Sequence, residues 1–390
     1  MPGPRQVMLS TGSNFPMPDP FRVGVIGSSG KGNYGHGLDT AFQDVEGATI
    51  VAVADDDATG RERVATTLRV EHSYSDYARM LRREKLDIVC VGPRWHTERV
   101  AMVTAAADAG CHIYCEKPFA PTLEAADIMA AAIRKAGVTL AMAHQWRAMA
   151  PVQRAIREIR EGKYGRLLRV TARPKDDSRG GGEELPLHGT HLFDMMLAMA
   201  GMPRWVSGHV QLDSRDVVKQ DRTEATEPIG PVAGDEIDAM YGFDHGVRGF
   251  FHSTANLAVD QQRDFDNLFG VVIECEKKRI QFRPPGDVFL YDAPWVLADL
   301  EQLKWEKVWI EDWHFTAEHQ PRSIRGSWVQ LGNKVLARDL MDAVSNDRAP
   351  LSGLEHAVAI TEMVQGVYGS HLDDGRRLKI PLADRSHPLT

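Results

Sequence analysis

The chain has 390 residues, of which 43% are hydrophobic and 26% charged, and its formal net charge is −8. This composition is typical of a soluble globular protein of two or three domains and excludes a disordered or fibrous chain. Because clustered lysine and arginine attract nucleic acids and anionic membranes, the negative balance argues against both as partners. No apolar run approaches the roughly 20 residues that a membrane helix needs.

The N-terminus and the cysteines indicate where the protein works. Residues 1–20 are rich in proline and have no apolar segment of the kind found in secretory signals, so we predict a loose polar arm. The cysteines lack the CxxC spacing of zinc and redox sites, and we expect buried thiols in a reducing, cytoplasmic compartment. They are Cys90, Cys111, Cys115 and Cys275.

Between residues 21 and 147, short apolar runs alternate with helix-like stretches. Strands are predicted at 21–27, 48–54, 86–91, 111–115 and 138–143, and helices at 34–45, 59–68, 74–84, 97–109 and 122–136. Continuous apolar strands separated by helices predict a parallel sheet covered on both faces, a doubly wound α/β domain. Such sheets bind ligands at the carboxyl ends of their strands.

The pattern changes after residue 147. A helix at 152–161 and a strand at 167–172 precede a polar loop with three consecutive glycines, which we expect to be flexible, and a helix at 191–199. Residues 206–289 are rich in strands without crossover helices, which predicts an antiparallel sheet open on one side. Within them, 220–233 is the best candidate for a mobile loop. Two helices near 333–345 and 354–369 close the chain.

A glycine-rich turn follows the first strand and precedes a predicted helix, which is the context of a dinucleotide-binding fingerprint. Gly27 permits a tight turn, and Gly32 would let the helix approach the strand with its N-terminus facing a pyrophosphate. Ser29 stands where the fingerprint usually has its second glycine. Taken alone, a glycine-rich turn without a ligand explains the pattern as well. The candidate cofactor residues of the turn are Gly27, Ser29, Gly30, Lys31 and Gly32.

Three aspartates end the second strand, about 20 residues beyond this turn, where a carboxylate accepts hydrogen bonds from the adenosine ribose. We therefore predict that Asp55 and Asp56 contact the cofactor. Acidic side chains repel a 2′-phosphate, which favours NAD over NADP. Lys31 and the pair of Arg61 and Arg63 argue in the opposite direction.

The fifth strand ends in Cys115-Glu116-Lys117-Pro118. A lysine at the carboxyl end of a central strand lies beside the nicotinamide in this architecture and can stabilise a developing alkoxide. The proline fixes the turn, and a cis bond is one way to do so. On chemistry alone, a surface lysine is the simpler interpretation.

Several motifs occur in a fixed order along the chain. This order resembles that of the Gfo/Idh/MocA family of NAD(P)-dependent sugar and polyol oxidoreductases, and the resemblance covers residues 21–380. The motifs are the turn at Gly27, Asp55, Pro93-Arg94-Trp95-His96, Glu116-Lys117-Pro118, Gln145-x-Arg147, the triple glycine, and Gly189-x-His191-x-x-Asp194. The resemblance implies a Rossmann domain (21–147) and a C-terminal α+β domain (148–390) with a large, open, mostly antiparallel sheet for substrate binding and oligomerisation.

The resemblance also implies individual roles. Lys117 would contact the nicotinamide ribose and the substrate hydroxyl, and His191 would act as general base or acid on that hydroxyl. A helix-capping or core histidine is the alternative for His191, and Asp194 is expected to be structural or to orient other groups. Further cofactor contacts are expected from Pro93, Arg94, His96, Glu116 and Gln145, and a substrate contact from Arg147.

One departure from the family pattern concerns the catalytic carboxylate. Family members commonly have Asp four residues before the histidine, where this chain has Leu187. His188 can substitute as a proton carrier or substrate ligand, or it can be an ordinary loop histidine. Nearby charges form either a solvated loop or a carbohydrate cradle. They are Lys175, Asp176, Asp177, Arg179, Glu183 and Glu184, of which Lys175, Arg179 and Glu183 are the candidate substrate ligands.

Metal binding is a weaker alternative. His188, His191 and Asp194 are potential ligands, but i and i+6 do not share a helix face, and neither cysteine ligands nor an H-E-x-x-H pattern is present. We expect no metal.

The leading hypothesis is an NAD-dependent oxidoreductase acting on a hydroxyl of a sugar, glycoside or cyclitol. An NAD-assisted glycoside hydrolase or lyase working through transient sugar oxidation is the alternative, and a non-catalytic sensor is a third class. The aromatic residues Trp305, Trp309, Trp313 and Phe315 indicate a packed segment or subunit interface, or a lid that stacks on sugars. By resemblance we expect a homodimer or homotetramer.

Overall fold

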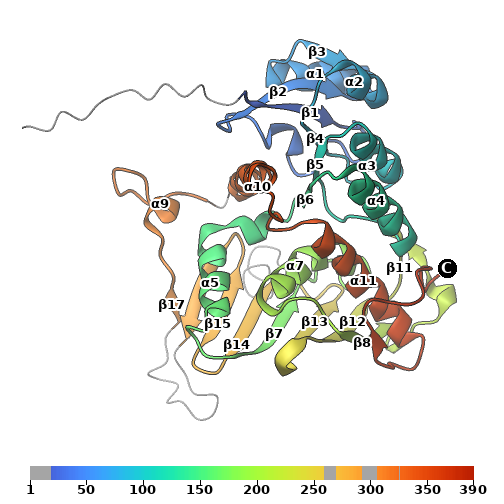
Figure 1. Cartoon of the computed structure of the whole chain (residues 1–390). Coiled ribbons are helices and arrows are strands. Elements are labelled where there is room, and N and C mark those ends of the chain that lie inside the picture. Colours follow the sequence, from blue (N-terminus) through green and yellow to red (C-terminus); the bar gives the residue numbers. More distant parts are fainter. Residues whose placement is uncertain (1–18, 259–268, 292–304, 325) are drawn as a thin grey trace, which may run out of the picture.

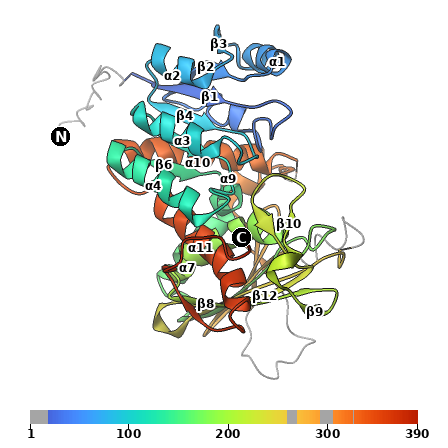
Figure 2. The same cartoon turned by 90° about the vertical axis from the view of Figure 1, so that its right-hand side faces the viewer.

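The computed structural model describes residues 19–258, 269–291, 305–324 and 326–390. Two sheets dominate these residues. Figure 1 shows the parallel sheet and its helices at one end of the molecule, the large second sheet at the other, and α10 between them. Figure 2 shows that α11 and α4 meet where the two parts join. Residues 1–18 of the predicted N-terminal arm lie outside the described residues.

The N-terminal part is the predicted doubly wound α/β unit. Its six-stranded parallel sheet has the order β3-β2-β1-β4-β5-β6, so the strand order reverses between β1 and β4. The strands are β1 (Phe21–Ile26), β2 (Ala48–Ala54), β3 (His72–Tyr74), β4 (Ile88–Val91), β5 (His112–Cys115) and β6 (Leu140–Met142). The helices are α1 (Ala58–Leu68), α2 (Tyr77–Arg83), α3 (Arg99–Asp108) and α4 (Leu123–Ala136). The short edge strand β3 was not predicted.

Helix ends follow local capping chemistry. The Asp57 carboxylate accepts a hydrogen bond from Gly60 N at 2.6 Å at the start of α1. Thr122 caps α4 through Ala125 N at 3.2 Å, and Gly137 ends α4 in the left-handed conformation. These caps place α1 and α4 directly after the carboxyl ends of β2 and β5.

The predicted helix at 34–45 is wrong. The segment forms turns with only a short 3₁₀ helix, η1 (Leu38–Thr40). The reason is a run of left-handed residues around the glycine turn, which an α-helix cannot contain. Their φ values are 77° at Gly30, 91° at Gly32, 53° at Asn33, 61° at Gly35 and 78° at Gly37.

The second part contains a ten-stranded sheet of order β17-β16-β15-β14-β7-β13-β12-β8-β18, with β9 paired to β8. All pairs are antiparallel except β7 with β13, which is parallel, and α7 carries the chain from β7 to β8 at the far side of β12 and β13. The strands are β7 (Leu167–Arg173), β8 (Trp205–Leu212), β9 (Arg215–Asp216), β12 (Glu236–Gly242), β13 (Arg248–Thr254), β14 (Gly270–Cys275), β15 (Arg279–Arg283), β16 (Asp287–Tyr291), β17 (Glu306–Lys307) and β18 (Leu378–Lys379).

Helices cover one face of this sheet, as Figure 1 shows for α5, α7 and α11. Residues alternate along the strands, for example buried Phe251 beside half-buried Phe250 on β13. The sheet is therefore open on its other face, as predicted. The helices are α5 (Ala150–Arg160), α6 (Glu184–Leu187), α7 (Gly189–Ala200), α9 (Glu311–His314), α10 (Trp328–Ser345) and α11 (Leu354–His371).

The triple glycine is packed rather than flexible, which corrects the expectation. A Cβ at Gly180 would lie 2.4 Å from Ala255 Cα, and one at Gly182 would lie 2.3 Å from Ala233 O. The 220–233 segment contains a small antiparallel pair, β10 (Thr223–Glu224) with β11 (Pro231–Val232), and it touches the Rossmann domain. Its mobility stays a prediction.

Two further expectations concern burial. All four cysteines are buried free thiols. In the aromatic stretch, Trp309 is 55% exposed and Trp313 packs partly against the core. None of the helices within the described ranges combines the length and the apolar character needed to cross a membrane.

The predicted domain boundary at residue 147 falls in the 3₁₀ helix η2 (Gln145–Ala148), between the last strand of one sheet and the first of the other. Here Asn333 of α10 ties three segments together. Its side chain accepts hydrogen bonds from Tyr114 Oη at 2.8 Å and Gln145 Nε2 at 2.9 Å, and it donates one to His36 O at 2.8 Å. These three hydrogen bonds fix the position of η2 relative to the segment after the glycine-rich turn.

Candidate active site

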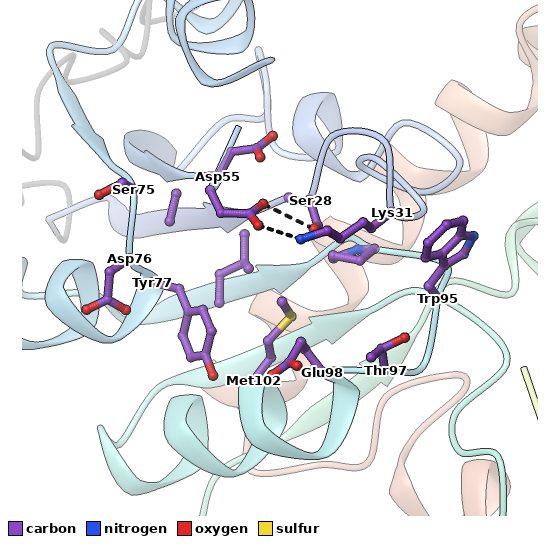
Figure 3. A pocket seen from close by; sticks show the side chains of 15 residues that line it. Ser28, Lys31, Asp55, Ser75, Asp76, Tyr77, Trp95, Thr97, Glu98 and Met102 are labelled. Atoms are coloured by element: carbon purple, nitrogen blue, oxygen red, sulfur yellow. Dashed lines mark hydrogen bonds and ion pairs between the residues drawn. The ribbon is translucent and has the colours of Figure 1, made fainter. Parts of the chain in front are cut away.

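A pocket of about 370 Å³ lies at the carboxyl ends of β1, β2 and β4 (Figure 3). The point where the strand order reverses is where such sheets bind ligands, and the volume is within the range of small-molecule sites, roughly 300–1,000 Å³. Tyr77, Trp95 and Met102 supply apolar surface, while Lys31, Asp56 and Glu98 supply charge. The wall therefore suits a ligand with one aromatic and one polar part.

The three aspartates after β2 have different partners. Asp55 is 2% exposed, and its carboxylate accepts hydrogen bonds from Ser29 N at 3.1 Å, Ser29 Oγ at 2.8 Å and Asp57 N at 3.0 Å. Asp56 lies in the pocket, 2.8 Å from Lys31 Nζ and 3.3 Å from Ser28 Oγ. Asp55 thus holds the turn in place, and Asp56 pairs with Lys31; both line the pocket, and their contact with a cofactor stays a prediction.

The glycine-rich turn packs tightly against the segment that follows β4. A Cβ at Gly32 would lie 2.5 Å from Trp95 N and 2.6 Å from Arg94 N. Much of the turn's polar backbone is paired internally: Gly30 N donates to Asn33 Oδ1 at 3.1 Å, and Lys31 N to Ser28 O at 3.0 Å. The turn is consequently preformed, without the α-helix N-terminus that the fingerprint usually provides.

Glu116 lies beneath this turn and is fully buried. Its carboxylate accepts hydrogen bonds from His36 N at 2.7 Å and Lys117 N at 2.9 Å, and His36 Nδ1 is 3.1 Å away. Burial raises the pKa of Glu116, but His36 and Lys117 outweigh it and lower the pKa to about 2. The buried Glu116 carboxylate therefore holds the segment that follows the glycine-rich turn through His36.

Arg99, on α3, was not predicted as a site residue. It is 1% exposed and donates hydrogen bonds to backbone carbonyls on both sides of the Lys117 turn: Pro93 O at 2.5 Å, Pro118 O at 2.8 Å, and Glu116 O. The Nε2–H of His96 also donates to Pro118 O at 3.1 Å. These contacts position the turn, whose Lys117–Pro118 bond is cis.

Lys117 is 4% exposed and points across the domain boundary, donating a hydrogen bond to Leu187 O at 3.3 Å. Burial lowers its pKa, and the negative charges of Glu116 and Glu184 oppose that shift. The simpler interpretation as a surface lysine is therefore wrong.

His191 lies near Lys117 and is 6% exposed, on the buried first turn of α7. Its ring makes an edge contact with His144 at a centroid distance of 5.4 Å. Burial, then the charge of Lys117, holds the pKa of His191 well below its usual value, so the imidazole is neutral at neutral pH. Within the described part of the chain, His191 Nδ1 and His144 Nε2 have no hydrogen-bond partner. Orphaned buried nitrogens of this kind indicate a polar ligand.

Asp194 and Arg147 form a buried pair at 3.0 Å. Asp194 also accepts hydrogen bonds from Ser352 Oγ at 2.9 Å and lies 3.0 Å from His356 Nδ1. Burial opposes ionisation of Asp194, but Arg147 outweighs it and keeps the pKa below its usual range. Arg147 is paired with Asp194, and the orienting role of Asp194 and the substrate contact of Arg147 stay predictions.

His188 lies against Glu184, which is fully buried on α6. His188 Nδ1 is 2.6 Å from Glu184 Oε2, and Arg179 Nη2 is 3.4 Å from Glu184 Oε1. Burial raises the pKa of Glu184 to about 7, partly offset by Arg179. Burial also holds the pKa of His188 well below its usual value. The sequence interpretation counted Glu184 only as one charge in a loop.

Other predicted residues lie at the edges of the site. Arg94 pairs with Glu227 at 3.0 Å, and Glu183 accepts a hydrogen bond from Thr226 N at 3.1 Å, so both contact the 220–233 segment. The substrate role of Glu183 stays a prediction. Lys175 is partly buried, and the charge of Glu184 acts on it.

The proposed metal ligands do not converge: His188 faces Glu184, and Asp194 faces Arg147. Across the described ranges, no group of three or more His, Cys, Asp or Glu side chains is arranged to hold a metal ion.

Comparison with known proteins shows which family the N-terminal part of the chain matches. Residues 21–144 match the sequence profile of GFO_IDH_MocA, described as an oxidoreductase family with an NAD-binding Rossmann fold. D-apiose dehydrogenase of Paraburkholderia graminis is 37% identical over 125 residues, which are 32% of this chain and 33% of that protein. D-glucoside 3-dehydrogenase of Escherichia coli is 29% identical over 200 residues, 47% of this chain and 55% of that protein. The chain thus spans a third to about half of the length of these relatives.

The fold is similar over a much longer stretch. A solved levoglucosan dehydrogenase, in complex with NADH and levoglucosan, superposes with a TM-score of 0.73, covering 93% of this chain and 100% of that one at 20% identity. Residues 21–144 therefore match the GFO_IDH_MocA oxidoreductase family, and the chain shares the fold of the solved levoglucosan dehydrogenase.

Proposed function

We propose that the chain is an NAD-dependent oxidoreductase that transfers hydride between nicotinamide and a hydroxyl of a sugar, glycoside or cyclitol. The observation that carries the proposal is the meeting of a buried lysine, Lys117, with a neutral buried imidazole, His191, at the carboxyl end of β5 and beside the preformed dinucleotide turn. The names of the dehydrogenase relatives support a carbohydrate substrate.

The described residues fit NAD. The pocket at β1, β2 and β4 combines an apolar wall, from Tyr77 and Trp95, with the Asp56 carboxylate where a ribose would bind. Asp56 also pairs with Lys31, so the cation that argued for NADP is partly neutralised. The segment after β4, with Pro93, Arg94 and His96, lies between the pocket and the turn that carries Glu116 and Lys117. Gln145 is hydrogen-bonded to Asn333.

NAD, when bound, supplies the hydride acceptor. The chain's own residues handle the proton. His191, uncharged at neutral pH, accepts the proton of the reacting hydroxyl, and the Lys117 ammonium stabilises the negative oxygen that remains. Ser352 Oγ lies 2.9 Å from Asp194 Oδ1 and 2.8 Å from His144 Nδ1. The Asp194–Arg147 pair thereby orients the His144 ring, which contacts the ring of His191.

Absorbance of NADH tests this function. Purified protein is incubated with NAD and a panel of pentoses, hexoses, glycosides and cyclitols, and the products are analysed. We expect NADH from the wild-type chain and from the control Lys135→Met, a surface lysine at the end of α4. Lys117→Met is expected to be inactive. NAD binding without turnover of any compound contradicts the proposal, and glycoside cleavage without net NADH supports the hydrolase or lyase alternative instead.

We also propose a cytoplasmic homodimer or homotetramer. The four free thiols favour a reducing compartment. The uncovered face of the large sheet carries partly exposed Met240 and Phe250 on neighbouring strands, which suits contact with a second copy. Light scattering that gives a monomer at micromolar concentration would contradict this assembly.

A further inference from the structure

The place where the family usually has its carboxylate is occupied by Leu187, and the structure brings a different carboxylate to the same region. Glu184 begins α6, one turn before His188, and its side chain is completely buried. The i, i+4 spacing points both side chains the same way. His188 Nδ1 is 2.6 Å from Glu184 Oε2, so a proton can pass between them.

The pair lies next to the proposed reacting groups. Lys117 Nζ donates a hydrogen bond to the carbonyl of Leu187, the residue before His188, and His191 N donates one to His188 O at 3.1 Å. After burial, the charges of Lys175 and then Lys117 lower the pKa of His188, and the charge of Lys117 lowers the pKa of His191.

Polar atoms of both side chains in the pair also have no hydrogen-bond partner within the described residues. Within the described residues, the two Glu184 oxygens and His188 Nδ1 make no hydrogen bond of acceptable geometry, although His188 Nδ1 and Glu184 Oε2 are close. Buried polar groups are rarely left this way without a function. Loosely aligned contacts of this kind are common in catalytic pairs before substrate binds.

We propose that Glu184 is the positioning carboxylate of this site: it holds His188 and exchanges a proton with it, and the pair replaces the proton carrier that Leu187 cannot be. The inference rests on the proposed oxidoreductase function. When hydride leaves the substrate carbon for NAD, the hydroxyl proton must leave the site. His191 accepts that proton first, and His188 then takes it up at its second ring nitrogen while the Nδ1 proton of His188 moves to Glu184 Oε2, so no net charge is stranded on either ring.

Several charged side chains face the pair and shift the pKa values of Glu184 and His188. Arg179 and Lys175 come from the loop before α6, and Lys117 from the turn after β5; all three favour the ionised form of Glu184. Asp177, on the same loop, and burial oppose it, and burial raises the pKa of Glu184 to about 7. His36, from the glycine-rich turn, also faces His188. A group that ionises near neutral pH can accept and return a proton.

The test uses Glu184→Gln, His188→Gln and the double variant, with Glu362→Gln as control. Glu362 is also a buried carboxylate paired with an arginine, Arg385, but on α11 away from this site. Infrared difference spectra between pH 5 and 9 follow protonated carboxyl groups without any turnover. We expect a carboxyl band that titrates near neutral pH in the wild type and the control, is lost in Glu184→Gln, and has a shifted midpoint in His188→Gln. A Glu184→Gln spectrum identical to that of the wild type overturns the inference.

Kinetics supply the second readout. We expect kcat of Glu184→Gln to fall about 100-fold, with the acid limb of its pH profile displaced and the Kd of NAD unchanged. The double variant should be no worse than His188→Gln, because the two residues act as one unit. Losses that multiply, or an unchanged acid limb, overturn the inference while leaving the oxidoreductase proposal standing. A titrating band in a wild-type chain that oxidises no carbohydrate supports the pair and contradicts only the proposed function.

Discussion

Replacing Asp56 by asparagine tests how the protein chooses its cofactor. The Asp56 carboxylate faces the pocket, 2.8 Å from Lys31 Nζ, and its side chain is 54% exposed. The substitution removes one negative charge from the pocket wall and releases the lysine. A 2′-phosphate carries about −1.5 to −2 charges at neutral pH, so it gains more from this change than the uncharged ribose of NAD does.

The size of the effect follows from the exposure. Two unit charges about 5 Å apart repel by about 3 kcal/mol at an effective dielectric constant of 20 and by about 1 kcal/mol in bulk water. A side chain that is half exposed lies between these limits, which gives about 1–2 kcal/mol. The ratio of the NADP and NAD dissociation constants should therefore change about 5- to 30-fold in favour of NADP.

Both dissociation constants can be measured by titration calorimetry or by quenching of Trp95, which lines the pocket. The matched control is Asp57→Asn, which removes the same charge from the next residue. Asp57 caps α1 and does not line the pocket, and asparagine is an equally good cap. An unchanged ratio in Asp56→Asn, or an equal change in Asp57→Asn, would refute the argument that a local carboxylate selects NAD.

Three further predictions concern the Lys117 turn and the glycine-rich turn. Lys117→Met should lower kcat by about 10³-fold with little change in the Kd of NAD; comparable losses in both would show a binding role instead. Glu116 has its pKa lowered from 4.5 to about 2, so its stabilising contribution is complete above pH 4.5 and is lost as the pH falls toward 2. Urea unfolding of Glu116→Gln should accordingly vary less with pH between 5 and 3 than that of the wild type, and parallel curves would contradict the assignment. Gly32→Ala should lower Tm clearly more than Gly30→Ala, because both have positive φ but only Gly32 meets backbone atoms, at 2.5 Å; equal shifts would refute the close approach.

Patterns within one element were readable from the sequence, and so the two sheets and the place of Lys117 just after β5 were predicted. Apolar runs of five to seven residues ended where β1, β2 and β5 end. The helix after the glycine-rich turn failed for a local reason as well: its apolar spacing is helical, but five residues between 30 and 37 adopt positive φ. Backbone conformation at glycine outweighed the hydrophobic pattern.

Contacts between distant segments were not predictable from composition or spacing. Arg99 sits in an apolar helix and looks like an exposed charge, yet it is buried and binds three carbonyls around the Lys117 turn. Glu184 is separated from His188 by one turn of α6, which the sequence analysis treated as part of a glycine-rich loop. Predicting α6 together with the i, i+4 spacing would have been the one signal for that pair.

Isotope transfer tests the central claim most directly. The wild-type chain and Lys117→Met are incubated with NAD and the carbohydrate that the panel identifies, deuterated at the carbon that carries the reacting hydroxyl. Mass spectrometry of the reduced cofactor should show one deuterium per NADH formed by the wild-type chain and almost no reduced cofactor from Lys117→Met. Undeuterated NADH, or equal yields from the two proteins, would contradict hydride transfer from a hydroxyl-bearing carbon beside Lys117.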